Sequence, residues 1–283
     1  MKKIITFLFL TASIAVYAQP KVLTQATVTT KTNIVAPEGD EPVQSTTTSD
    51  GGEVRVMRFG GDGETKTTTW LKNDLTKIFS ESEMGRTTVI RDNTKKLTTT
   101  IMEIMGKKSG FYVTDADQAE MRKRMDSMMR TRTQAPGVSF SNTPPVYRFE
   151  YFEDTKNILG FICKKSQMIG TRSDGRSDTT LIWYCPDFKL QNLPSTGGNA
   201  GGFGGFNLVS GIDGIGDLNG FPFQYERNMR NGRKMTVQVT KLVIDKEIAD
   251  KEFEISKNIE IKSMKENMQN SGGTGFQMRV INQ

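Results

Sequence analysis

A succession of short segments with β-strand periodicity, separated by turn residues, constrains the fold of this chain most strongly. The first half contains six such segments, at residues 54–59, 65–71, 75–79, 86–91, 96–104 and 108–114. Asn73-Asp74 and Asp92-Asn93 separate two pairs of them, and Asn and Asp favour the backbone conformations of tight turns. Strands of this length and spacing favour an antiparallel sheet over βαβ units.

The second half repeats the pattern with sharper hairpin signals. Strand-like segments occupy residues 145–152, 158–169, 178–188, 221–229 and 234–244. Asp174-Gly175 and Asn231-Gly232 lie between members of this series, and both dipeptides favour two-residue hairpin turns. Residues 251–256 and 259–264 predict one or two closing edge strands. The sequence therefore predicts a mainly β fold.

One helix interrupts the strands, over residues 115–131. Thr114 or Asp115 can cap its N-terminus, and Asp117 or Gln118 can complete a capping box. Acidic residues come early in the helix and arginines late, which suits the helix dipole. The helix is expected to end before Pro136.

A stripe of methionines follows one face of this helix. Met121, Met125 and Met128 recur at the spacing of one helical face, with Met129 beside them. Three interpretations stay open. The stripe packs in an ordinary core, it forms a lid over an acyl-chain cavity, or its thioethers bind Cu(I) without support from a histidine.

The two ends of the chain differ in composition from this β series. Residues 1–18 have a charged start, a short apolar stretch and a small-residue cleavage site before Gln19, as in a secretory signal peptide. Export to the periplasm or the cell exterior is therefore expected. Residues 19–51 are rich in Thr, Ser and Pro and predict a flexible leader, with a short strand over residues 22–28 left open because Thr and Val favour extended backbone. Residues 266–283 predict a flexible tail.

Charge and residue types exclude several classes of function. The chain has a formal net charge of +6 but no histidine, which excludes Ser-His-Asp and Cys-His sites. Its basic residues are dispersed rather than clustered, so nucleic acid is not an expected partner. Paired carboxylates such as Glu150/Glu153 or Glu252/Glu254 could serve acid–base chemistry, but the first two fall on opposite strand faces and the second two suit a solvated face. No enzyme activity and no cofactor are predicted.

The two cysteines, Cys163 and Cys185, flank the predicted Asp174-Gly175 hairpin. A turn centred on Asp174 would place them directly opposite each other, at a separation that suits a disulfide. A two-residue Asp174-Gly175 turn would instead shift them by one residue onto opposite faces. A disulfide and two buried free thiols both remain open, and the loop length decides whether a bridge can form.

A glycine-rich segment spans residues 194–220 and includes Phe203 and Phe206. It has no GxGxxG motif followed by a helix, so it does not predict a phosphate site. Two interpretations remain: an unstructured insertion, or an apolar loop that contacts a ligand or a partner.

The order of several motifs resembles one protein family. These motifs are GKKS at Gly106, the Met-rich helix, ILGFICKK at 158–165, IWYCPDF at 182–188, GFPFQYE at 220–226 and KMTVQVTKLVIDKEIADKEFEI at 234–255. Together they resemble the exported domain of unknown function 4412, which is similar to LolA-like carriers of outer-membrane lipoproteins and distantly to the GLPGLI family.

The resemblance covers residues 52–265 and implies a half-barrel of curved antiparallel sheet with helical cover over a concave apolar face. It implies no reaction. This chain departs from the pattern in its glycine-rich segment and in GIDGIGDLNGFP, which stands where GLPGLI proteins carry their motif.

The sequence thus predicts a curved antiparallel sheet that, with a Met-rich helical lid, encloses an apolar groove. Met121, Met125, Met128, Met129, Phe203 and Phe206 are the candidate ligand-lining residues. The hypothesis is a non-enzymatic envelope protein that binds a lipid or lipoprotein acyl chain. The alternative is a structural or interaction module with a filled interior that contacts envelope proteins.

Overall fold

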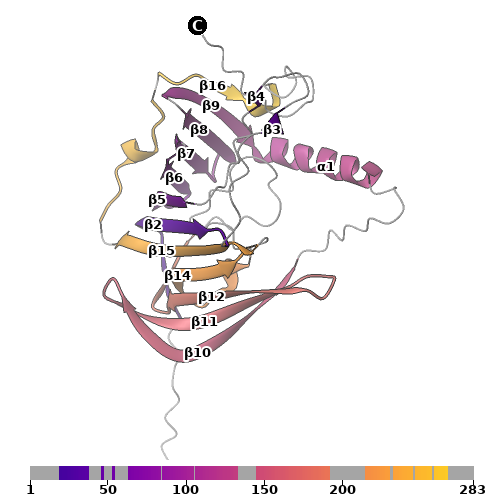
Figure 1. Cartoon of the computed structure of the whole chain (residues 1–283). Helices are drawn as coiled ribbons and strands as arrows, with labels where there is room; N and C mark the ends of the chain where they lie inside the picture. The colour runs from indigo at the N-terminus through magenta and orange to yellow at the C-terminus, as the bar shows by residue number, and fades with distance from the viewer. Residues whose placement is uncertain are drawn as a thin grey trace, which may run out of the picture.

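The computed structural model of the chain is dominated by β-strands (Figure 1). It describes residues 19–37, 46–47, 53–54, 63–83, 85–104, 106–132, 145–191, 214–229, 232–244, 246–256 and 258–266. The N-terminal half contains β1 (Lys21–Leu23), β2 (Gln25–Val35), β3 (Thr46–Thr47), β4 (Glu53–Val54), β5 (Gly63–Lys72), β6 (Leu75–Ser82), β7 (Gly85–Asp92), β8 (Leu97–Ile104), β9 (Lys107–Thr114) and α1 (Asp115–Arg132).

The C-terminal half contributes the remaining strands and two short 3-10 helices. They are β10 (Val146–Ile158), β11 (Phe161–Thr171), β12 (Ser177–Cys185), β13 (Phe188–Leu190), η1 (Ile215–Asp217), β14 (Phe221–Asn228), β15 (Lys234–Val243), η3 (Asp250–Phe253) and β16 (Ile261–Ser263).

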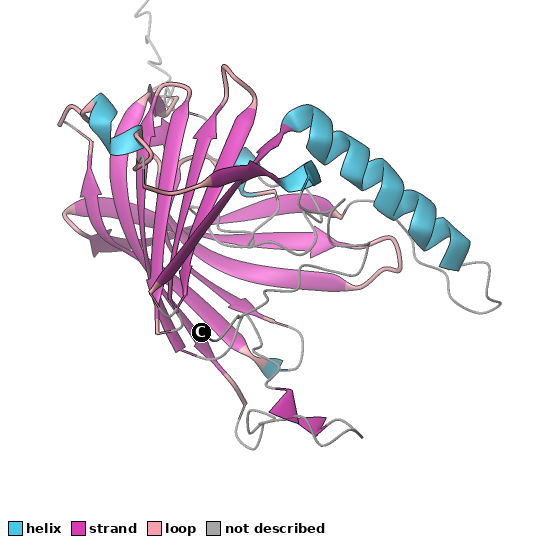
Figure 2. Cartoon of the chain, turned by 90° about the horizontal axis from the view of Figure 1, so that it is seen from above, coloured by secondary structure: helices cyan, strands magenta, loops and turns pink. Residues whose placement is uncertain are grey.

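Twelve of these strands form one curved, open sheet (Figure 2). Its order is β10-β11-β12-β14-β15-β2-β5-β6-β7-β8-β9-β16. Neighbours pair antiparallel except at one edge, where β16 runs parallel to β9. The predicted fold class, a curved antiparallel sheet with one long helix, is confirmed.

The predicted flexible leader is wrong for residues 21–35. These residues form β1 and β2, and β2 lies in the middle of the large sheet between β15 and β5. Ala26 and Val28 on β2 are fully buried. Threonine is polar but β-branched, and it fits an extended strand well. The sheet therefore begins well before residue 52.

Two further boundaries differ from the sequence prediction. A turn at Leu159-Gly160 divides the segment predicted as one strand at 158–169, so that β10 extends to Ile158. Residues 251–256 were expected in an edge strand, but η3 and extended chain occupy them. The strand expected within 259–264 is confirmed as β16.

The predicted helix and its capping box are confirmed. The Thr114 hydroxyl accepts a hydrogen bond from the Asp117 N–H at 3.1 Å, and the Asp117 carboxylate accepts one from the Thr114 hydroxyl at 2.6 Å. Arg91 also forms an ion pair with Asp115 at 2.6 Å, which ties the first turn of α1 to β7. This arrangement satisfies backbone donors that a helix start leaves free.

The main core lies where β10–β15 meet the small sheet formed by β1 and β13. Its centre is a group of four rings, from Phe161, Phe188, Phe221 and Phe223, with neighbouring centroids 5.2–5.7 Å apart. We call these four residues the aromatic cluster. Its rings interlock at near-optimal separations and so anchor this half of the molecule.

Candidate functional site

A segment of extended chain crosses the outside of β5–β9 on its way to β16. We call residues 246–256 and 258–260 the strap. The Lys72 ammonium donates hydrogen bonds to the Ile248 carbonyl at 2.7 Å and to the Asp250 carboxylate at 2.6 Å. Ile248 and Phe253 of the strap are buried against the sheet. The strap is therefore held by both polar and apolar contacts.

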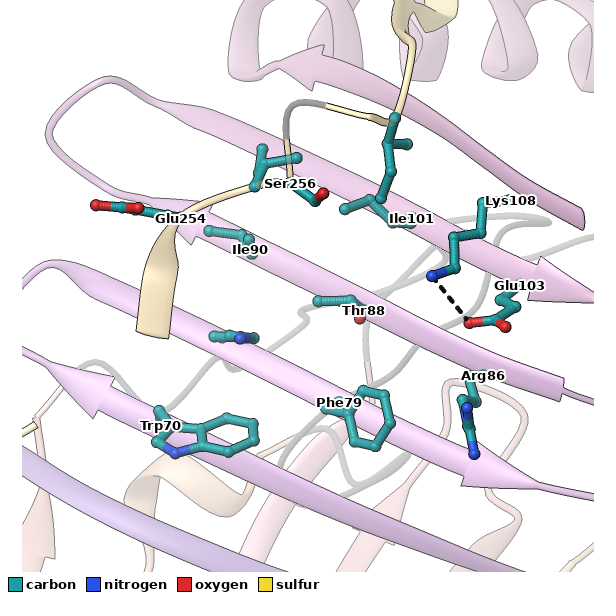
Figure 3. A pocket seen from close by; sticks show the side chains of 13 residues that line it. Trp70, Phe79, Arg86, Thr88, Ile90, Ile101, Glu103, Lys108, Glu254 and Ser256 are labelled. Atoms are coloured by element: carbon teal, nitrogen blue, oxygen red, sulfur yellow. Dashed lines mark ion pairs between the residues drawn. The ribbon is translucent and has the colours of Figure 1, made fainter. Parts of the chain in front are cut away.

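A groove of about 440 Å³ lies between the strap and the sheet (Figure 3). Its lining residues come from five strands and the strap: Trp70, Lys77, Phe79, Arg86, Thr88, Ile90, Ile101, Glu103, Lys108, Glu254, Ile255, Ser256 and Ile259. Six of these side chains are large and apolar, and the other seven are polar or charged. Ligand sites in proteins are commonly apolar clefts of this size with a few polar groups.

The floor of the groove follows from strand alternation. On β6, Lys77 and Phe79 face the groove, while Thr76, Ile78 and Ser80 are buried on the other face. On β7, Ile90 faces the groove, whereas its neighbour Arg91 contacts α1. Because successive side chains point to opposite faces, the groove and the start of α1 lie on opposite faces of the sheet.

Charged side chains gather at one end of the groove. Figure 3 shows Arg86, Glu103 and Lys108 together there, with Glu254 at the opposite end. Lys108 pairs with Glu103 at 3.7 Å. Arg86 donates a hydrogen bond to Glu81 at 2.9 Å, which raises the pKa of the guanidinium. The groove therefore carries its large apolar side chains among a few polar ones, with charged side chains at its ends.

One lysine links the strap to the floor. The Lys77 ammonium lies 5.1 Å from the centre of the Trp70 ring and donates a hydrogen bond to the Glu252 carbonyl at 2.6 Å. A cation over an aromatic face is stabilised by the ring quadrupole. Lys77 thus holds the strap in place while its stem covers part of Trp70.

The close approach of the strap at the sheet edge depends on a glycine. A Cβ atom at Gly110 on β9 would lie 2.2 Å from the Ile261 Cδ1 atom. Gly110 pairs with Ile261 in the parallel β9–β16 register. A larger residue at this position would force the Ile261 side chain to move.

The residues predicted to line a ligand site do not line this groove. Met121 is half-buried on α1 and is absent from the lining residues. Met125, Met128 and Met129 belong to α1, but their side chains lie outside the description, as do Phe203 and Phe206 altogether. The methionine lid therefore stays a prediction.

The structure brings the two cysteines together as free, buried thiols. An odd-length loop at residues 172–176 joins β11 to β12, and the register Lys164↔Tyr184 places Cys163 opposite Cys185 at the next step. Burial raises the pKa of Cys163 to about 12 and that of Cys185 to about 11. Thiols with such pKa values are poor nucleophiles at neutral pH.

Sequence reasoning missed the groove because its parts are distant in the chain. The floor lies in residues 70–108 and the strap in residues 254–259. One signal was available. Trp70, Phe79, Ile90 and Ile101 are large side chains on strands whose other face is also buried, and strands covered on both faces need a covering element on each. Within the described residues, no three potential metal-ligating side chains are grouped.

Comparisons with known proteins give weak similarity of overall fold. No family model and no curated protein matches the chain. Two structures of PNGF-II superpose with a TM-score of 0.36 at 14% and 15% identity; they cover 87% and 89% of this chain, which spans about a third of their length (32% and 33%). The resemblance to the domain of unknown function 4412 and to GLPGLI proteins thus remains a prediction.

Two smaller proteins match over most of their own length. A LolA superfamily protein from Nitrosomonas europaea has a TM-score of 0.30 at 8% identity, covering 82% of this chain and 91% of its own. A domain from Vibrio parahaemolyticus, assigned to outer membrane lipoprotein sorting, has a TM-score of 0.29 at 8% identity, covering 81% and 88%. Separately, none of the helices in the described part of the chain has the length and apolar character needed to span a membrane.

Proposed function

We propose that this chain is an exported, non-enzymatic binding protein that holds the acyl chain of a lipid or lipoprotein in the groove beneath the strap. The observation that carries the proposal is an apolar groove of about 440 Å³ with charged side chains at its ends. An acyl chain buries apolar surface, which contributes about 25 cal/mol for each Å² removed from water.

The ends of the groove suit a ligand with a polar head. Arg86 and Lys108 can donate hydrogen bonds to phosphate or carboxylate oxygens, in addition to their ion pairs with Glu81 and Glu103. Trp70, Phe79 and Ile101 would contact the chain itself. Binding of this kind needs no reacting group in the groove, and release needs only movement of the strap.

The first test is native mass spectrometry of the mature protein, purified without detergent. We expect a co-purifying mass of lipid size that is lost on denaturation. Ile101→Asp places a charge on the groove floor and should abolish retention. Val146→Asp makes the same change at an exposed position on β10 and is the matched control. A bare wild-type mass, together with no uptake of a fluorescent fatty acid, would contradict the proposal.

The second candidate is an envelope interaction module, and the filled core of the β10–β15 half favours it. The aromatic cluster leaves that half occupied by its own side chains. At the same edge, β10 is an outer strand of the sheet and carries exposed apolar residues such as Val146. An open strand edge can pair with an extended segment of another protein. Retention of a lipid that depends on Ile101 would exclude this as the main function.

A further inference from the structure

The turn between β10 and β11 contains a residue that the turn itself disfavours. Leu159 and Gly160 connect Ile158 to Phe161, and both have positive φ, at 53° and 86°. A two-residue turn with two positive φ angles normally carries Asn or Asp at its first position and Gly at its second. A bulky residue with a Cβ is strained in the left-handed region.

The same turn exposes apolar side chains beside a buried core. Leu159 is 47% exposed and Ile162 is 64% exposed, whereas the adjacent Ile158 is buried. Phe161 packs into the aromatic cluster at 5.7 Å from Phe188, so the turn is firmly anchored. A strained and exposed leucine on a rigid support contributes little to folding, and such outliers often mark functional positions.

Three lysines lie near the turn. We call residues 155–165 the hairpin tip; it contains Lys156, Lys164 and Lys165 and no acidic residue. Asp154 precedes it and forms an ion pair with Lys165 at 3.8 Å. Asp187 approaches from the segment before β13 and lies close enough to affect Cys163. The hairpin tip therefore combines two exposed apolar side chains with three lysines, and neighbouring carboxylates, among them Asp154 and Asp187, offset part of that charge.

We propose that the hairpin tip docks on the surface of an anionic lipid bilayer. Leu159 and Ile162 would enter the region between head groups and acyl chains, while Lys164, on the same strand face as Ile162, contacts lipid phosphates. Basic residues near an anionic membrane each add favourable electrostatic energy, and lysine stems can lie along apolar surface while the ammonium stays solvated.

A membrane fits this surface better than a protein partner does. Specific protein interfaces bury at least about 1,000 Å², and a narrow turn with two apolar side chains offers much less. Insertion into a bilayer becomes more favourable with each apolar side chain that is buried, and it needs no partner surface of matching shape. The hairpin tip also lies in the β10–β15 half, away from the groove, so this inference does not depend on the proposed function.

The test is co-sedimentation of the folded protein with lipid vesicles. Wild-type protein should bind vesicles of phosphatidylcholine mixed with phosphatidylglycerol, bind pure phosphatidylcholine vesicles less, and lose affinity as salt is added. The double variant Leu159→Asn/Ile162→Thr should reduce the partition constant roughly tenfold or more, because two apolar side chains no longer insert.

The design separates binding from folding. Asn is the preferred residue at a turn position with positive φ, so Leu159→Asn should leave the thermal unfolding temperature unchanged or raise it. Val146→Thr, at a 73% exposed position at the other end of β10, is the matched control and should bind as wild type does. No binding of wild type to anionic vesicles at low salt would overturn the proposal. So would full binding by the double variant, or an equal loss in the control.

Discussion

The two halves of the large sheet bury their surfaces in different ways. In the β10–β15 half, the rings of the aromatic cluster interlock with one another and with β13. In the β5–β9 half, the buried face carries small hydroxyl side chains, among them Thr67, Thr69, Thr76 and Ser80. The opposite face of that half is covered by the strap and leaves the groove.

This difference shows how one sheet can combine a rigid support with a binding space. Rings that pack against rings from several strands fill the volume between them. A single extended segment contributes only a few side chains, here Ile255 and Ile259, and cannot fill the space above a row of large residues. The groove therefore exists where the covering element is thin, and the opposite half supplies the stability.

The largest expected effect tests the filled half. Phe223→Ala removes a fully buried ring from the aromatic cluster and should lower the free energy of unfolding by about 3–5 kcal/mol. Phe79→Ala in the groove floor should cost less, because that ring is only partly buried and already borders open volume. Urea unfolding of both variants measures the comparison. Equal losses would mean that the two halves are packed alike.

A second test uses the thiols of the filled half as reporters. Burial raises the pKa of Cys163 to about 12 and of Cys185 to about 11, so both stay protonated in the folded state near pH 8. Alkylation at that pH should be slower than in urea by roughly a hundredfold or more, since free cysteine has a pKa of about 8.5.

The same pKa shifts predict alkaline destabilisation. Above about pH 8.5 the unfolded chain loses thiol protons that the folded chain keeps, so stability present below that pH falls as the pH rises toward the folded pKa values. Intact mass measurement provides the control, because a disulfide would leave the chain two hydrogens lighter. Rapid alkylation of the folded protein would show that this half opens readily.

The third test loosens the covered half. Lys72→Met removes hydrogen bonds to the Ile248 carbonyl and the Asp250 carboxylate and should cost about 1.5–3 kcal/mol. Hydrogen exchange should increase in the strap and stay unchanged in the aromatic cluster. Lys66→Met, at an exposed position on the same strand, is the matched control. Faster exchange throughout the sheet would mean that the strap is part of the global folding unit.

The smallest expected effect concerns a buried hydroxyl. The Thr69 hydroxyl is fully buried, and within the described part of the chain it has no hydrogen-bond partner. Thr69→Val keeps the shape of the side chain and removes the unpaired group, so it should stabilise the fold by about 1 kcal/mol. The neighbouring Thr67 hydroxyl bonds Ser80 at 3.0 Å, and Thr67→Val should instead destabilise. A loss of stability in both variants would reveal a partner for Thr69.

Local signals predicted much of the fold. The capping box at Thr114 and the hairpins that join β11 to β12 and β14 to β15 depend on neighbouring residues, and each is found in the structure, although Asn231 lies outside the described residues. The turn at Leu159-Gly160 was missed because leucine is not a turn residue. Strand β2 was anticipated only in part, as the alternative of a short strand over residues 22–28, because its composition suggested disorder, whereas its pairing depends on distant strands.

The candidate site was less accessible to sequence analysis. Its floor and roof are separated by about 150 residues, and only the path of the strap after β15 brings Ile255 above Ile101. The opposition of Cys163 and Cys185 depended on a loop length that the dipeptide signal alone did not fix. The groove and the opposition of the cysteines both depend on how distant segments are placed against each other, and no short segment of the sequence determines that placement.

The central position of β2 has a consequence for the order in which the chain can fold. Its residue Thr32 pairs with Val237, more than two hundred positions later, and its other edge pairs with β5. A chain is made from its N-terminus, so β2 is available early and must wait for β15 before both of its edges are paired. Contacts of such sequence separation slow folding. The threonines of β2 favour an extended strand, and they also make the unpaired strand polar. Such a strand can wait in water without exposing an apolar edge to neighbouring chains.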